Sequence, residues 1–134
     1  MAEQKGPRPT DAELEILKVL WRRGPSTVRE VFETLGETKQ TGYTTVLKFM
    51  QIMSEKGLVR RDESERAHRY EAAVPEDETQ RQLVGDLLQK AFDGSARKLV
   101  LHALSADPAS AGELAEIRRM LDEFEEGGGG DTHS

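Results

Sequence analysis

The sequence predicts a mainly α-helical fold that contains one small β-hairpin. Three observations predict it: apolar residues recur every three or four positions in several segments, motifs of the type Thr-x-x-Glu precede these segments, and two short strand-like segments flank a polar turn. A chain of 134 residues accommodates one domain, or one small domain with an appended helical segment. Because such a small domain buries a limited core, we expect an obligate dimer.

The first two helices are each predicted to begin with a capping box, in which the Thr and Glu side chains bind each other's free backbone amides. The boxes are Thr10 with Glu13 and Thr27 with Glu30. Behind the first box, Leu14, Leu17 and Trp21 form an apolar stripe at helical spacing. Glycines are expected to end the two helices, at Gly24 and Gly36.

The third helix is predicted over residues 42–56, after a polar loop at 37–41. Its expected C-cap is Gly57, and its expected buried stripe consists of Val46, Phe49, Met50 and Met53. Two short strands, 58–61 and 68–72, are predicted on either side of the polar turn 62–67. Helix, helix, helix and hairpin is the order of a winged helix-turn-helix.

After Pro75 the chain is predicted to be helical again, with a break at Asp93-Gly94, an apolar helix at 99–104 and a last helix capped by Ser110. These helices carry no candidate site of their own, so we interpret them as a dimerisation segment. The candidate dimerisation residues are Leu83, Leu87, Leu101, Leu104, Leu114, Ile117 and Leu121. The expected organisation is a disordered arm at 1–9, a winged-helix domain at 10–73, a helical dimerisation domain at 74–126 and a disordered, glycine-rich tail at 127–134.

The distribution of charge leaves room for an acidic binding partner, although the net charge is −6. Residues 1–73 carry 13 Lys and Arg against 12 Asp and Glu, whereas residues 74–134 carry 6 against 13. The N-terminal part is therefore free to present a local basic face.

No enzyme chemistry, metal site or cofactor is predicted. The absence of cysteine excludes disulfides, thiolate metal sites and cysteine nucleophiles, and the three histidines are far apart in sequence. The acidic pairs lie in solvated runs, and no glycine-rich loop opens a helix to bind a phosphate. No apolar run is long enough to span a bilayer and the N-terminus lacks a signal-peptide stretch, so we expect a cytoplasmic location and no membrane insertion.

Two features indicate DNA binding. The third helix is expected to present Tyr43, Thr44, Lys48 and Gln51 outward, where hydroxyls and amines reach base edges and phosphates. The hairpin carries basic side chains suited to the phosphate backbone, at Arg60, Arg61, Arg66, His68 and Arg69. Each feature has a plain alternative, namely a solvated helix face and a hairpin neutralised by its own acidic residues. The alternative function is a winged-helix module for protein–protein interaction that binds no operator.

Several motifs, in the same order and spacing, resemble the penicillinase-repressor family of transcriptional regulators over residues 8–126. They are residues 13–21 (ELEILKVLW), 43–47 (YTTVL), 55–61 (EKGLVRR) and Arg69-Tyr70. The resemblance implies a homodimeric repressor with an N-terminal winged-helix DNA-binding domain and a C-terminal helical dimerisation domain. Each protomer would place its third helix in the major groove of one half of a palindromic, double-stranded operator. The residues carried over are Gly42, Tyr43, Thr44, Thr45 and Lys48 for the major groove, and Arg60, Arg66 and Arg69 for backbone contacts from the wing.

Two departures from the family concern the inducing signal. Copper-responsive members carry a cysteine cluster near the C-terminus, and this chain has no cysteine. Members that respond to β-lactams are inactivated when a membrane sensor-protease system signals cleavage of an Asn-Phe bond, whereas this chain has Leu101-His102-Ala103-Leu104 at the corresponding place. The resemblance thus implies a sensor-protease signalling system as a possible partner. Because the Asn-Phe pair is missing, cleavage at His102-Ala103 is doubtful and the inducing signal stays open.

Overall fold

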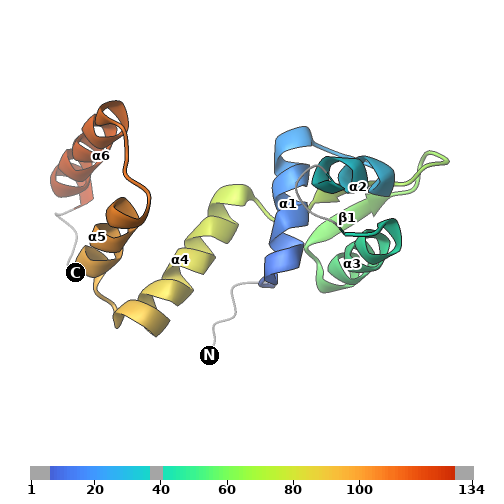
Figure 1. Ribbon diagram of the computed structural model, residues 1–134, viewed down its shortest axis with the longest axis horizontal. Helices are drawn as coiled ribbons and strands as arrows, with labels where there is room; N and C mark the ends of the chain where they lie inside the picture. The colour runs from blue at the N-terminus through green and yellow to red at the C-terminus, as the bar shows by residue number, and fades with distance from the viewer. Residues whose placement is uncertain (1–6, 37–40, 129–134) are drawn as a thin grey trace. The chain divides into compact units, whose positions relative to one another are not determined.

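The computed structural model describes residues 7–36 and 41–128 (Figure 1). Its elements form two compact units that divide between Asp86 and Leu87, within one helix. In chain order they are α1 (Asp11–Arg23), α2 (Val28–Gly36), α3 (Tyr43–Lys56), β1 (Val59–Asp62), β2 (Arg69–Ala72), α4 (Glu76–Phe92), α5 (Ala96–Ala106), α6 (Ala111–Glu123) and the π-helical turn η1 (Phe124–Gly128). The mainly helical fold with one antiparallel hairpin is confirmed.

Both predicted capping boxes are present. The Thr10 amide donates to Glu13 Oε1 at 2.9 Å, and the Glu13 amide donates to Thr10 Oγ1 at 3.2 Å. At the start of α2 the corresponding bonds between Thr27 and Glu30 are 3.0 and 3.1 Å long. Each box satisfies two amides that the first turn of a helix leaves free, so the sequence motif determines where α1 and α2 begin.

The core of the N-terminal unit lies between α1, α2, α3 and the hairpin, which pack together (Figure 1). From α3 it takes Val46, Met50 and Met53, which confirms the predicted stripe, while Phe49 is only partly buried. Burying each such side chain contributes about 1.5–3 kcal/mol. The other buried apolar residues are Ile16, Leu17, Val19, Leu20, Val28, Val31, Leu35, Leu58, Val59 and Tyr70.

The hairpin is attached to the turn between α1 and α2. Val59 pairs with Ala72, and Asp62 pairs with Arg69. The first strand is shifted by one residue from the predicted 58–61, and the second begins one residue after the predicted 68. Ser26 forms an isolated antiparallel bridge with Tyr70, with N–H···O distances of 2.9 and 2.7 Å, and its hydroxyl donates to the Gly24 carbonyl. These bonds hold the base of the wing on the helices, while the tip between the strands projects beyond them (Figure 1).

Residues 76–86 of α4 belong to the N-terminal unit, while the division into domains at 73/74 stays a prediction. Trp21 Nε1 donates to the Val74 carbonyl at 2.9 Å, immediately before α4. The guanidinium of Arg8, in the arm expected to be disordered, makes a two-bond ion pair with Asp86 at 2.6 and 3.1 Å. Contacts between residues distant in sequence therefore extend this unit beyond the hairpin.

In the C-terminal unit the helix ends follow the predicted signals. The break falls at Asp93 and Gly94, both of which have positive φ, and Ser110 caps α6 by accepting from the Glu113 amide. Helix α5 is longer than the predicted 99–104 because Ser95 accepts from the Lys98 amide and starts it earlier. Gly127 and Gly128, expected in the tail, form part of η1. The rest of the tail at 129–134, the arm at 1–6 and the predicted loop at 37–40 lie outside the described residues.

Candidate nucleic-acid interface

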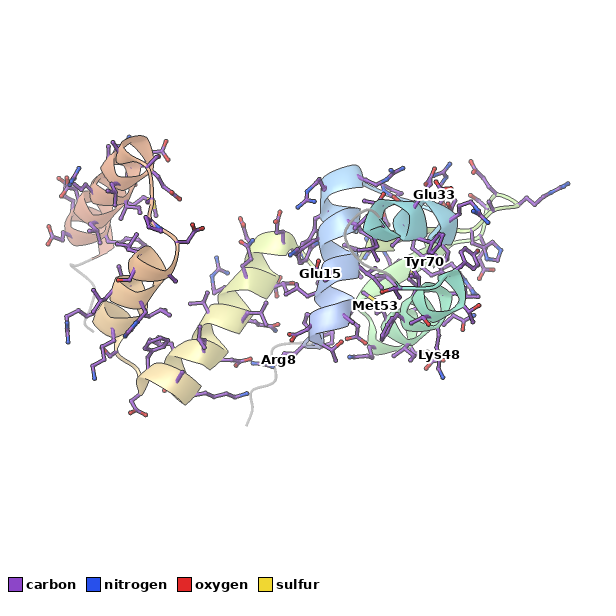
Figure 2. All side chains as sticks on the ribbon, viewed as in Figure 1. Arg8, Glu15, Glu33, Lys48, Met53 and Tyr70 are labelled. Carbon is purple, nitrogen blue, oxygen red and sulfur yellow. The ribbon has the colours of Figure 1, made fainter. Side chains whose placement is uncertain are left out.

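The outer face of α3 carries the residues that the sequence predicted for DNA contact. Tyr43, Thr44, Thr45 and Lys48 are exposed. Thr44 and Lys48 lie on the side opposite the buried methionines, whereas Tyr43, seven residues before Met50, lies on the same side as Met50 at the exposed first turn. Figure 2 shows Lys48 on the outer side of α3 and Met53 toward the core of the unit. Gly42 is the N-cap and supplies no side-chain hydrogen bond, and a helix start without a side-chain cap suits an anion such as a phosphate.

Tyr43, the first residue of α3, packs against two residues of α2 that sequence reasoning did not single out as partners. Its ring meets the Phe32 ring edge-on, with centroids 5.7 Å apart, and the Arg29 guanidinium lies 5.5 Å from the Tyr43 ring centroid. Such aromatic pairs contribute about 0.5–1.5 kcal/mol beyond area burial. The side chain of Tyr43 is therefore held at a defined place beside the N-terminus of α3.

Most arginines of the wing have carboxylate partners. Arg60 binds Glu71 across the hairpin at 3.1 Å, and Arg61 binds Glu63. Arg69 lies 3.4 Å from Glu30 of α2 and 3.5 Å from Glu65. Within the described part of the chain, Arg66 at the tip makes no ion pair. The structure therefore brings the three candidate wing residues Arg60, Arg66 and Arg69 onto one hairpin, but two of them already neutralise acidic side chains.

Glu30 connects α1, α2 and the wing. Its carboxylate accepts the Thr27 amide and faces Arg69 and, at 3.8 Å, Arg23 near the end of α1. The Thr27 backbone hydrogen bond, followed by the attraction of Arg69 and Arg23, lowers the pKa of Glu30 despite partial burial. Arg69 thus fixes the wing to α2, a structural role in addition to the predicted DNA contact.

Glu13 connects α1 to the end of α3. Its buried carboxylate receives the Lys56 ammonium at 2.6 Å while it also caps α1. Burial alone raises the pKa of Glu13, but the hydrogen bond from Lys56 and the bonds with Thr10 outweigh burial, so the pKa is lowered. The carboxylate is therefore ionised at neutral pH and holds the last residue of α3.

The candidate dimerisation residues are incompletely buried in one chain. Leu87, Leu101 and Leu121 are exposed, with Leu121 at 58%. The described residues of α5 and α6 include none that is buried. Of the seven candidates, four are partly buried: Leu83, Leu104, Leu114 and Ile117. Leu83 belongs to the N-terminal unit, and the other six candidates belong to the C-terminal unit.

Two further features bear on classes of function. No described group of three His, Asp or Glu side chains is arranged to hold a metal ion. Among the helices that the structure describes, none is long and apolar enough to cross a membrane.

The bond between His102 and Ala103 lies within α5, where the His102 ring contacts Phe92, so a protease reaches it only after local unfolding of this helix.

Comparison with known proteins identifies relatives over nearly the whole chain. The family model described as Penicillinase repressor matches residues 9–123. A transcriptional regulator BlaI of Mycobacterium tuberculosis is 36% identical over 120 residues, 89% of this chain and 86% of the relative, and a penicillinase repressor of Bacillus licheniformis is 26% identical over 90% and 94%. The solution structure of Bacillus licheniformis BlaI, as a monomeric form in complex with the blaP half-operator, matches 56% of this chain and 92% of that structure with a TM-score of 0.50 and 27% identity. The chain belongs to the penicillinase repressor family.

Proposed function

We propose that this protein is a transcriptional repressor that binds a palindromic operator as a homodimer, with α3 in the major groove and the wing on the phosphate backbone. The observation that carries the proposal is the exposure of Tyr43, Thr44, Thr45 and Lys48 on the first two turns of α3, while the core-facing residues of the same helix are buried. Hydroxyl and ammonium groups at the start of such a helix suit base edges and phosphates. The half-operator complex of a relative supports DNA as the partner.

The charges of the wing define what it contributes. Because Arg60 and Arg69 are paired with glutamates, each has to exchange a carboxylate for a phosphate, which reduces the net gain. Arg66 at the tip has no carboxylate partner among residues 7–36 and 41–128, so we assign it the larger share of backbone binding. Phosphate contacts of this kind position the protein and make affinity depend on salt.

The apolar residues left unburied on α5 and α6 support a second copy of the chain as partner. Leu101 and Leu121 are both more than half exposed, and such apolar surface is normally covered in a protein–protein contact. A palindromic site also requires two copies of α3 related by two-fold symmetry. We therefore propose that the C-terminal unit holds the dimer together.

DNA binding is tested by fluorescence anisotropy with the DNA upstream of the protein's own gene and a scrambled duplex, each over a series of salt concentrations. Lys48→Ala is expected to weaken binding to the upstream DNA about tenfold, the typical effect of one lost contact. Lys90→Ala, on α4, makes the same change of charge and should bind as the wild type. Binding that shows no salt dependence and no preference for the upstream DNA would favour the alternative, a protein–protein interaction module.

Dimerisation is tested by sedimentation analysis of the full chain. Leu87→Asp combined with Leu121→Asp places two charges on the proposed interface, so a monomer is expected that binds a half-site weakly. A control with the same number of substitutions, Gln89→Asp with Arg119→Asp, changes exposed polar residues and should remain dimeric. A dimer that persists in the leucine variant would assign the interface to another surface.

A further inference from the structure

We propose that Arg29, on α2, is an additional phosphate-contacting residue of the DNA interface, and that the ring of Tyr43 holds its guanidinium in position. The inference rests on the proposed function and deepens it, since it adds a residue outside α3 and the wing. No motif in the sequence identifies Arg29, because its significance depends on a contact between two helices.

The contact places Arg29 beside the first residue of α3. Its guanidinium carbon lies 5.5 Å from the centroid of the Tyr43 ring, within the range of a cation–π interaction. Phe32, one turn further along α2, supports the same ring edge-on at 5.7 Å. The three side chains form a cluster that joins α2 to the N-terminus of α3, the part of α3 that is proposed to enter the major groove.

The guanidinium remains available to a ligand. The side chain of Arg29 is 67% exposed, and its carboxylate partner Glu33 lies 3.7 Å away, beyond hydrogen-bond length. Arg60, in contrast, is bound to Glu71 at 3.1 Å. A cation–π contact uses none of the guanidinium's N–H groups as hydrogen-bond donors to an oxygen, so these donors remain available to the oxygens of a phosphate. Arg29 therefore gives up little when it binds DNA.

A second group acts in the same place. The first amides of α3 are free of a side-chain cap because Gly42 stands at the N-cap, so they attract the same kind of anion. Tyr43 links the two groups, since its amide belongs to the first turn of α3 and its ring contacts Arg29, so we propose that the DNA backbone meets donors from both helices. Since the Tyr43 ring limits the freedom of Arg29 before binding, less conformational entropy is lost when the phosphate arrives.

The test compares salt dependence among variants, with anisotropy on the upstream and scrambled duplexes as above. Arg29→Gln is expected to weaken both duplexes about equally, roughly tenfold, and to reduce the slope of log affinity against log salt by about 0.9. Arg118→Gln, on α6, removes the same charge and should leave the slope unchanged. Thermal unfolding of each variant verifies that the fold is retained.

The role of Tyr43 is separated by combining substitutions. Arg29→Gln made in a Tyr43→Phe background, where the ring remains, should weaken binding by the same factor as in the wild type. Made in a Tyr43→Ala background it should weaken binding only about threefold, because the arginine is no longer held. A wild-type slope in Arg29→Gln would overturn the phosphate contact, and equal losses in both backgrounds would overturn the role of the ring. If the wild type itself shows no salt-dependent DNA binding, the proposed function fails, and this inference fails with it.

Discussion

Replacing Glu13 with Gln isolates the charge that joins α1 to the end of α3. The glutamine keeps an oxygen that accepts the Thr10 amide, so the capping box survives, but the Lys56 ammonium at 2.6 Å loses its counter-charge. Only 4% of the Glu13 side chain is exposed, whereas Lys56 is 35% exposed and can turn toward water. The stability lost with this charge should therefore lie between the losses typical of breaking a buried ion pair and a surface ion pair. We expect the free energy of unfolding to decrease by about 1–2 kcal/mol.

The same pair makes a prediction about pH. The folded state holds the pKa of Glu13 below its ordinary value of 4.5, so the ionised carboxylate stabilises the fold above that value. This stabilisation is lost as the pH falls through the folded-state pKa. The difference between wild type and Glu13→Gln should thus be constant near pH 7 and decrease below about pH 4.5.

The assay is urea unfolding of the wild type, Glu13→Gln, Lys56→Met and the double variant, followed by circular dichroism. Glu30→Gln is the matched control, since Glu30 also closes a capping box but meets Arg69 only at 3.4 Å and is more exposed. Its loss should stay below about 1 kcal/mol. If Glu13→Gln costs no more than Glu30→Gln, or if the double-variant cycle shows a coupling below about 0.5 kcal/mol, the reasoning about burial is refuted.

Two other substitutions test how the N-terminal unit is held. Gly24→Ala should lower stability by about 2–3 kcal/mol because φ 88° with ψ −167° is essentially restricted to glycine, whereas Gly57→Ala, at φ 85° and ψ 13°, should cost less, about 1 kcal/mol. Equal melting temperatures for the two variants would contradict this ranking. Trp21→Phe removes the donor to the Val74 carbonyl and should cost about 1 kcal/mol. It should also accelerate amide hydrogen exchange in the first turn of α4, and unchanged exchange there would show that other contacts hold this helix.

The sequence predicted those parts of the fold that depend on nearby residues. The starts of α1 and α2 follow from Thr-Glu pairs three positions apart, and the buried face of α3 follows from its helical spacing. The bridge between Ser26 and Tyr70 was not predicted, because it joins residues that only the folded chain brings together. For the same reason the hydrogen bond from Trp21 to the Val74 carbonyl, just before α4, was not predicted, since no local pattern announces it.

In the candidate site, too, features that depend on nearby residues could be predicted, whereas those that depend on contacts distant in sequence could not. Which residues of α3 face outward could be predicted from periodicity, and Thr44 and Lys48 are exposed as expected. The pairing of Arg69 with Glu30 and the cation–π contact of Arg29 with Tyr43 depend on how α2 packs against its neighbours. Charge content alone therefore could not distinguish arginines already bound to carboxylates from those open to a phosphate.

The two capping-box glutamates link the opening of distant segments. Glu13 starts α1 and also holds Lys56 at the end of α3, and Glu30 starts α2 and also holds Arg69 of the wing. Fraying of the first turn of α1 thus loosens an attachment of α3, and fraying of the first turn of α2 loosens an attachment of the wing, the two segments proposed to contact DNA. Formation of either ion pair in turn suppresses the fraying. Amides at the start of α1 and at the end of α3 should therefore share one opening event in hydrogen exchange, as should those at the start of α2 and in β2.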